Sequence, residues 1–335
     1  AVGAVGFDGV LAAAGSAKPR PMASITKVVV ALVVLEEHPL DVDAEGPAIT
    51  MTPADVALYD AYRRVNGKVL PVRAGQVFTE RELLELTLIE SANNYSTSLA
   101  NWAFGSEQAF VREARSWLAE QGLPGIRVVD ATGLSPDNRA TAADLVELGR
   151  IALADPVVAE IVGTDELQVH DVGLLENTNE LLGTRGVTGI KTGTLDGYGA
   201  NLLFSAEYTV GATRVTVIGV VLGGEDHPTL NRAIADLLKS VRAGFHELDV
   251  SDVGQDFATY TTPWGQSAAA EAAAEATLLT WGDTPVASDV RVDPVRLAEA
   301  GTRVGEVVFT SGERSTTVPL VLSDALTDPG PGWRL

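Results

Sequence analysis

The sequence contains no cysteine, few basic residues and no long apolar run. The lack of cysteine excludes a disulfide framework, a thiol nucleophile and a cysteine-ligated zinc site. Lys and Arg number 24 against 45 Asp and Glu, which gives a formal net charge of -21. Such an acidic surface repels phosphate groups, so neither nucleic acid nor anionic lipid is an expected partner. No apolar run approaches the roughly 20 residues that span a bilayer, so any membrane anchor is expected outside this sequence.

The first residues show no recognisable export signal. Residues 1–17 are small and apolar, but no basic segment precedes them, and Gly9 and Gly15 interrupt them. The sequence begins with Ala rather than Met, which is consistent with a leader that was removed or left out. The compartment therefore has to be inferred from the chemistry.

The order of the expected elements predicts an α+β fold. These elements are strand-like residues at 1–14, a helix at 24–37, a mainly helical stretch at 50–165, strands at 186–194, 200–210 and 213–223, and a helix at 231–245. The order predicts an antiparallel sheet with flanking helices and a helical subdomain, together forming a domain over residues 1–246.

Two helices inside the helical stretch carry start signals. Thr79 is followed three residues later by Glu82, which is the spacing of a capping box. Thr141 stands in the same relation to Asp144 and precedes a run with helical apolar spacing. We therefore expect helices to begin directly after Thr79 and Thr141.

Residues 247–335 are expected to form a small, β-rich C-terminal domain. Residues 305–310 and 316–322 alternate in the manner of strands. Residues 265–279 are rich in Ala and Glu, so their intrinsic propensity favours a helix, yet their neighbours look like strands. The sequence leaves this segment open.

The first candidate motif is Ser24-Ile25-Thr26-Lys27, at the head of the first expected helix. Residues three apart lie on one face of a helix, so Lys27 can reach the Ser24 hydroxyl. A serine hydroxyl becomes a good nucleophile when a base takes its proton, and a lysine whose pKa is lowered by burial can be that base. Taken alone, the pair is more typical of a capping serine with an exposed lysine.

The second motif is Ser91-Ala92-Asn93, in a polar patch after a helix. The Ser91 hydroxyl could relay a proton between Lys27 and a leaving amine. The Asn93 amide could bind a substrate carbonyl and also hold Lys27. Taken alone, this motif is equally typical of a helix-to-helix turn.

The third motif is Lys191-Thr192-Gly193-Thr194, at the end of an expected strand. Gly193 removes a side chain where a substrate backbone could approach, and an extended peptide could pair with this edge. Lys191 and the hydroxyls of Thr192 and Thr194 could take up a carboxylate. The neighbouring Asp196 would weaken that binding if it pointed inward.

Together the three motifs are the signature of β-lactamases and penicillin-binding proteins, whose middle motif is usually Ser-Asp-Asn. The chain resembles the D-alanyl-D-alanine carboxypeptidases among the low-molecular-mass penicillin-binding proteins, over about residues 1–245. Further segments similar to that family are Ala131-Thr132-Gly133-Leu134, Thr141-Ala142-Ala143-Asp144-Leu145, Asn177-Thr178-Asn179-Glu180-Leu181-Leu182 and Gly197-Tyr198. Ala92 departs from the pattern, since Gly is familiar there.

The resemblance implies a serine carboxypeptidase that removes the terminal D-alanine of peptidoglycan stem peptides and is acylated by β-lactams. The implied roles are an acyl-enzyme on Ser24, general base Lys27, proton relay Ser91, substrate orientation by Asn93, carboxylate binding by Lys191 and Thr194 beside Thr192 and Gly193, and an oxyanion hole from the N–H groups of Ser24 and Thr194. It also implies an extracytoplasmic enzyme without cofactor. The residues leave open whether such an enzyme trims terminal D-alanine, cuts cross-links or does both.

Other readings are less consistent with the residues. A class A β-lactamase needs a glutamate that activates the deacylating water, and residues 127–138, where it should fall, contain none. A sensor or wall-binding module that is acylated without turnover would keep all three motifs, so it stays open.

A histidine-based or metal-based site finds no support in the sequence. No Gly-x-Ser-x-Gly segment accompanies the four histidines, His38, His170, His227 and His246, which are expected at the surface or at helix ends. No His-Glu-x-x-His segment occurs either, and no metal site is expected.

Overall fold

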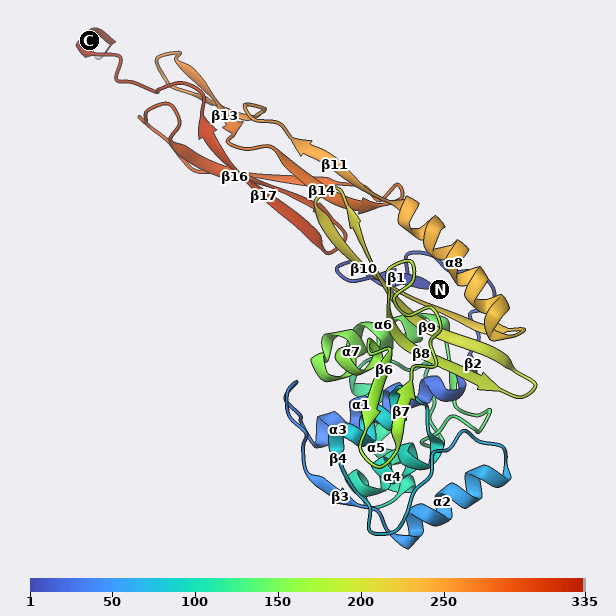
Figure 1. Ribbon diagram of the computed structural model, residues 1–335. Helices are drawn as coiled ribbons and strands as arrows, with labels where there is room; N and C mark the ends of the chain where they lie inside the picture. The colour runs from blue at the N-terminus through green and yellow to red at the C-terminus, as the bar shows by residue number, and fades with distance from the viewer. Residues whose placement is uncertain (334–335) are drawn as a thin grey trace. The chain divides into compact units, whose positions relative to one another are not determined.

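The computed structural model describes residues 1–333 and divides into two compact units. The first unit contains residues 1–5, 9–208 and 215–239, and the second contains residues 6–8, 209–214 and those from 240 onward. Figure 1 shows helices packed around a sheet in the first unit and strands in the second. This arrangement confirms the predicted α+β class, and each unit is described by itself below.

A four-stranded sheet in the order β1-β10-β9-β8 runs through the first unit. Its strands are β1 (Val2–Ala4), β8 (Val187–Leu195), β9 (Gly199–Val210) and β10 (Thr213–Gly224). β8 and β9 are antiparallel and joined by a tight turn, in which the Tyr198 N–H donates to the Leu195 carbonyl at 2.9 Å. The three strands predicted after residue 185 are therefore confirmed, and β8 occupies an edge.

The described residues contain the helices predicted at 24–37, after Thr79, after Thr141 and at 231–245, although the last begins four residues earlier, and the stretch 50–165 is mainly helical as predicted. The helices are α1 (Thr26–Glu37), α2 (Pro53–Arg64), α3 (Glu80–Leu88), α4 (Asn93–Phe104), α5 (Glu107–Glu120), α6 (Ala142–Ala154), α7 (Pro156–Val162) and α8 (His227–Gly244). The first turn of the helix predicted at 24–37 is a 3₁₀ turn, η1 (Ala23–Ile25). Residues 26–35 of α1 are all buried, so α1 is a central helix that is surrounded by the rest of the first unit.

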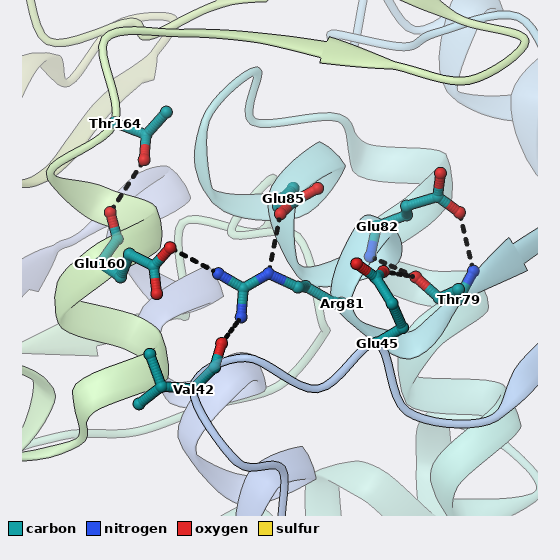
Figure 2. Close-up of polar contacts among 8 residues, drawn as sticks. All are labelled: Val42, Glu45, Thr79, Arg81, Glu82, Glu85, Glu160 and Thr164. Carbon is teal, nitrogen blue, oxygen red and sulfur yellow. Dashed lines mark hydrogen bonds and ion pairs between the residues drawn. The ribbon is translucent and has the colours of Figure 1, made fainter.

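Both predicted helix starts are confirmed. The Thr79 hydroxyl accepts from the Glu82 N–H at 3.1 Å, and the Glu82 carboxylate accepts from the Thr79 N–H at 2.8 Å (Figure 2). The Thr141 hydroxyl accepts from the Asp144 N–H at 3.1 Å. The bonds to the Thr79 and Thr141 hydroxyls satisfy helix N–H groups that otherwise have no partner, and only the first pair is reciprocal. Short paired strands complete the first unit: β2 (Arg20–Pro21) with β5 (Arg139–Ala140), β3 (Ala48–Thr50) with β4 (Val77–Thr79), and β6 (Glu166–Val169) with β7 (Gly173–Glu176).

Arg81 connects three parts of the first unit (Figure 2). Its guanidinium contacts Glu85 on its own helix at 3.2 Å, Glu160 of α7 at 2.8 Å and the carbonyl oxygen of Val42. The Arg81 side chain is only 11% exposed. Burial raises the pKa of Glu85 to about 7, and the charge of Arg81 opposes that rise. Arg81 thus compensates a carboxylate whose burial is otherwise unfavourable.

The second unit contains a five-stranded sheet in the order β12-β13-β17-β16-β15 and a separate pair, β11 with β14. The strands are β11 (Phe245–Ser251), β12 (Asp256–Thr261), β13 (Ser267–Ala272), β14 (Ala276–Trp281), β15 (Ala287–Val292), β16 (Arg303–Ser311) and β17 (Arg314–Leu322). Residues 265–279, for which the sequence left helix and strand open, therefore contain strand β13 and the beginning of strand β14. Ala268, Ala270 and Ala272 alternate into the core, and this burial together with pairing to β12 and β17 outweighs their helix propensity.

We expect Arg81→Ala to lower the free energy of unfolding of the first unit by about 3 kcal/mol, because it leaves a buried carboxylate without its cation. Arg64→Ala is the matched control, since Arg64 is exposed and bonds only to the Asp60 carbonyl of its own helix. The control should change stability by less than about 0.5 kcal/mol. Urea unfolding curves measure both. Equal effects of the two substitutions would show that the Arg81 contacts do not stabilise the fold.

Candidate active site

Lys27 lies within hydrogen-bonding distance of Ser24 and two further oxygens. Its Nζ is 3.0 Å from Ser24 Oγ, 2.6 Å from Asn93 Oδ1 and 2.8 Å from the carbonyl oxygen of Thr132. The contacts expected from the i, i+3 spacing and from the Asn93 amide are thus present. Lys27 is completely buried, whereas Ser24 is partly exposed.

The environment of Lys27 favours the neutral amine. Burial lowers its pKa to about 7, with Asp130 opposing the shift and Lys68 adding to it. A neutral amine has two N–H groups and one lone pair, and the oxygens of Asn93 and Thr132 can only accept. When both N–H groups are used there, the lone pair is left for the Ser24 hydroxyl. This geometry is that of a base poised to take the proton of Ser24.

The Thr132 carbonyl is held in place by a loop folded around Asp130. The Asp130 carboxylate accepts from the Thr132 N–H at 2.8 Å, the Gly133 N–H at 2.7 Å, the Ser135 N–H at 3.0 Å and the Asn138 amide at 2.8 Å. A carboxylate that accepts several N–H bonds fixes the backbone around it. The loop therefore presents a backbone oxygen to Lys27 with little freedom.

Gly133 lets this loop approach the turn that carries Ser24. Its φ is +84°, and a Cβ built there would lie 1.9 Å from the carbonyl oxygen of Ala23. Ala23 and Ser91 are themselves in the left-handed region, with φ of 51° and 62°. Left-handed backbone in non-glycine residues costs energy and is concentrated at functional sites.

The second motif stands between α3 and α4. Ser91 is 6% exposed, and Asn93 is the first residue of α4 and 3% exposed. The Asn93 N–H donates to the Lys68 carbonyl at 2.8 Å, which ties the start of α4 to the loop that follows α2. The Asn93 side chain is thereby directed at Lys27.

The third motif lies on edge strand β8, directly beside η1. A Cβ on Gly193 would be 2.9 Å from the Met22 carbonyl oxygen and 3.2 Å from the Ser24 N, so only glycine allows β8 to lie this close. Thr194 is exposed at the end of the motif. The Ser24 N thus lies beside Gly193, the residue that precedes Thr194.

Lys191 is the cation of the third motif, and its pKa is strongly shifted. Burial lowers its pKa well below the ordinary value, and Lys27 and Lys68 add to the shift while Glu90 opposes it. Its Nζ lies 3.4 Å from Thr178 Oγ1, and Thr178 lies 2.6 Å from Thr192 Oγ1. Lys191 thus contacts, from the interior side, the pair of hydroxyls formed by Thr178 and Thr192.

These residues meet at a cleft of about 780 Å³ in the first unit. Of the predicted site residues, those on its surface are Ser24, Ser91, Asn93, Thr192, Gly193 and Thr194. Lys27 and Lys191 lie in the interior behind it. Asp196 is exposed and also lines the cleft.

Sequence reasoning missed several groups of this site. The Thr132 carbonyl and its Asp130 anchor carry no sequence signature, although the segment around Gly133 was recognised as similar to the family. Thr178 also lay in a recognised segment without an assigned role. His227 was expected to be an ordinary surface or helix-end residue, but its Nε2 lies 2.7 Å from Thr194 Oγ1 and it lines the cleft.

Within residues 1–333 no group of three His, Cys, Asp or Glu side chains is placed to hold a metal ion. In the same described part of the chain, no helix combines the length and the apolar character needed to cross a membrane.

Comparison with known proteins identifies the family. The family model described as D-alanyl-D-alanine carboxypeptidase, Peptidase S11, matches residues 7–226, and the chain belongs to this family. A D-alanyl-D-alanine endopeptidase of Pseudomonas aeruginosa is 31% identical over 171 residues, which cover 49% of this chain and 52% of that protein. A D-alanyl-D-alanine carboxypeptidase of Mycobacterium tuberculosis is 32% identical over 181 residues, covering 52% and 58%. The match thus spans about half the length of these curated relatives.

Solved structures share the fold. A peptidoglycan synthesis regulatory factor of Streptococcus pneumoniae has a TM-score of 0.70 at 23% identity, and the match covers 97% of each chain. The penicillin binding protein 5 of Haemophilus influenzae has a TM-score of 0.68 at 19% identity, covering 98% of this chain and 96% of that one. These likenesses confirm the predicted fold class.

We expect Gly133→Ala to disrupt the site by pushing the Asp130 loop away from Ala23, because its Cβ would overlap the Ala23 carbonyl. Gly122→Ala is the matched control, since Gly122 has a similar φ of 71° but open space around its Cβ position. In the control, backbone strain should lower the free energy of unfolding by only about 1 kcal/mol. Gly133→Ala should lower it distinctly more. Thermal unfolding compares them. Equal losses would show that the close approach is unimportant.

Proposed function

We propose that this chain is a serine D-Ala-D-Ala carboxypeptidase that acts on peptidoglycan stem peptides outside the cytoplasm and is acylated by β-lactams. The observation that carries the proposal is the position of Lys27. Its buried amine has a pKa of about 7, uses Asn93 and Thr132 as acceptors, and lies 3.0 Å from the partly exposed Ser24 hydroxyl. Membership of the carboxypeptidase family supports the substrate class.

In the proposed mechanism, Ser24 Oγ attacks the carbonyl carbon of the penultimate D-alanine while Lys27 takes the hydroxyl proton. The oxygen of the tetrahedral intermediate is stabilised by the N–H groups of Ser24 and Thr194, each worth about 3 kcal/mol. The C–N bond then breaks, and the proton passes through Ser91 to the leaving amine. Water, deprotonated by the same lysine, hydrolyses the ester and regenerates Ser24.

The edge strand of the sheet would bind the substrate. We propose that the substrate backbone extends along β8 beside Gly193, because an edge strand offers unpaired N–H and C=O groups to an extended peptide. The Asn93 amide would bind a substrate carbonyl, and Lys191 with the hydroxyls of Thr192 and Thr194 would favour a carboxylate. The relatives include both carboxypeptidases and endopeptidases, and the same acyl-enzyme chemistry serves either cut.

We assign this chemistry to residues 1–246 and propose that residues 247–335 form the separate β-rich domain. The second unit contains none of the residues of the proposed mechanism. A role in positioning the catalytic part, toward a membrane anchored elsewhere or toward partners, fits a domain of this kind.

Two alternatives differ in the fate of the acyl-enzyme. A class A β-lactamase would need a carboxylate free to activate water, but the carboxylate in the corresponding loop, Asp130, is occupied by backbone and amide N–H groups. A sensor would form the same adduct without turnover. D-alanine release from a stem pentapeptide separates the carboxypeptidase from the sensor.

The first prediction of this proposal concerns the nucleophile. Wild-type protein incubated with benzylpenicillin should gain the mass of the drug on the peptide that contains Ser24, and Ser24→Ala should gain none. Peptide mapping by mass spectrometry makes the measurement. Ser16→Ala, an exposed serine outside the cleft, is the control and should be acylated as the wild type is. An adduct on Ser24→Ala would sink the assignment.

The second prediction concerns the base. Because Lys27 must be neutral to take a proton, the acylation rate should rise about tenfold per pH unit below pH 7 and level off above it. Lys27→Arg should lose acylation by at least about 100-fold, since a guanidinium does not titrate in this range. Lys239→Arg, at an exposed position of α8, should leave the profile unchanged. A rate independent of pH between about 5 and 8 would contradict the role of Lys27.

A further inference from the structure

The carboxylate end of the cleft contains a histidine that the mechanism above does not use. His227 is the first residue of α8, is half-buried, and lines the cleft beside Thr194 at the end of β8. Its Nε2 and the Thr194 hydroxyl oxygen are 2.7 Å apart, which is a short hydrogen bond for this pair. One of the two hydroxyls expected to meet a substrate carboxylate is therefore already bonded to a titratable ring.

We propose that His227 is a proton-dependent receptor for the C-terminal carboxylate of the substrate. In its protonated form it donates to Thr194 Oγ1, leaves the Thr194 O–H free to donate to the carboxylate, and adds a positive charge beside it. This inference rests on the proposed carboxypeptidase function and concerns the part of that site that binds the leaving residue.

The hydrogen-bond chemistry of the pair explains why protonation matters. A neutral imidazole that is protonated at Nδ1 accepts at Nε2, uses the Thr194 O–H and leaves no donor for an anion; the tautomer that is protonated at Nε2 donates to Thr194 Oγ1 but carries no charge. An imidazolium has an N–H at both nitrogens, so Nε2 must donate and the Thr194 O–H is free to turn toward an anion. Protonation thus adds a positive charge in either case and excludes the tautomer that occupies the hydroxyl. A carboxylate gains from both effects.

Two other cations lie near this cleft, and each has a different environment from His227. Lys68 lines the cleft but is paired with Glu90 at 2.7 Å. Lys191 is completely buried and lies 3.4 Å from Thr178 Oγ1, so it would favour a carboxylate from the interior side, without standing on the cleft surface. A charged group on the surface itself, beside Thr194, would add to the effect of Lys191. His227 is on the cleft surface and within one hydrogen bond of Thr194.

Charged groups on several elements act on His227. Burial lowers the pKa of the ring, Lys191 lowers it further, and Glu180 and Asp226 raise it. Because the lowering prevails, the cation is populated only on the acid side of neutrality. The charged groups near His227, from β8, the segment before β8 and α8 with its N-terminal turn, are Glu180, Lys191, Asp196, Asp226 and Arg232.

The two titrations of the site then act in opposite directions. Protonation of Lys27 stops acylation, so the chemical step slows as the pH falls through about 7. Protonation of His227 strengthens carboxylate binding, so KM falls as the pH falls. The optimum for a carboxylate substrate should consequently be narrower, and more acidic, than that for a neutral substrate.

The experiment compares two substrates, an N-acylated peptide ending in D-Ala-D-Ala and the same peptide with its C-terminal carboxylate converted to an amide. At about pH 5.5, His227→Gln should raise KM for the carboxylate substrate about tenfold, because a charge-assisted bond is lost, with kcat within about twofold. The amide substrate should be unaffected. His227→Arg, a permanent cation, should keep KM low and independent of pH up to about 8.

A matched control is His170→Gln, since His170 is a highly exposed histidine in the turn between β6 and β7. Equal losses on both substrates in His227→Gln would mean that His227 only supports the fold of the cleft, which overturns the proposal. A pH-dependent KM that persists in His227→Gln would also overturn it. If wild-type protein forms no Ser24 adduct with benzylpenicillin, the proposed function itself fails. An adduct together with unchanged KM values rejects only the role of His227.

Discussion

The arrangement of the candidate cleft depends on the burial of one amino group. Lys27 projects from a helix that is buried on every side, and burial of an ammonium group disfavours its charge. The structure compensates with polar partners, the amide of Asn93 and the carbonyl of Thr132, rather than with a direct ion pair. The amine therefore stays satisfied when neutral. A base that is neutral near pH 7 is the result.

The other features of the cleft follow from the need to bring three distant segments to this amine. Gly133 allows the Asp130 loop to contact the turn of Ser24, and Gly193 allows strand β8 to do so from the other direction. Ala23 and Ser91 take up left-handed backbone at the junctions, a cost of about 1–3 kcal/mol each. The buried helix α1 and the Asp130 hydrogen bonds offset this cost. The buried helix and the Asp130 loop thus hold in place the strained backbone at Ala23 and Ser91.

The cleft also combines a buried group with accessible ones. The Lys27 amine is buried and contacts the partly exposed Ser24 hydroxyl from the interior side. Thr194 and His227 lie on the cleft surface, where a charged substrate terminus could enter. A buried base can keep a lowered pKa only if mobile charges stay away from it, whereas a receptor for an anion has to be open to solvent. The distribution of burial therefore matches the two kinds of chemistry.

Much of this protein is determined by sequence patterns that act over short distances. The helix at Lys27 and the strands after residue 185 were predictable because apolar periodicity reflects which faces are buried, and the start of α3 because Thr79 and Glu82 bond each other locally. The three motifs could be recognised because their residue types are rare in that combination. Only tertiary structure decided the rest. Residues 265–279 contain strands because neighbouring strands bury their alternate alanines, and the Thr132 carbonyl and His227 belong to the site because packing brings them there. A backbone oxygen has no sequence signature, and a single histidine has no periodicity, so their roles depend on contacts between residues far apart in the chain.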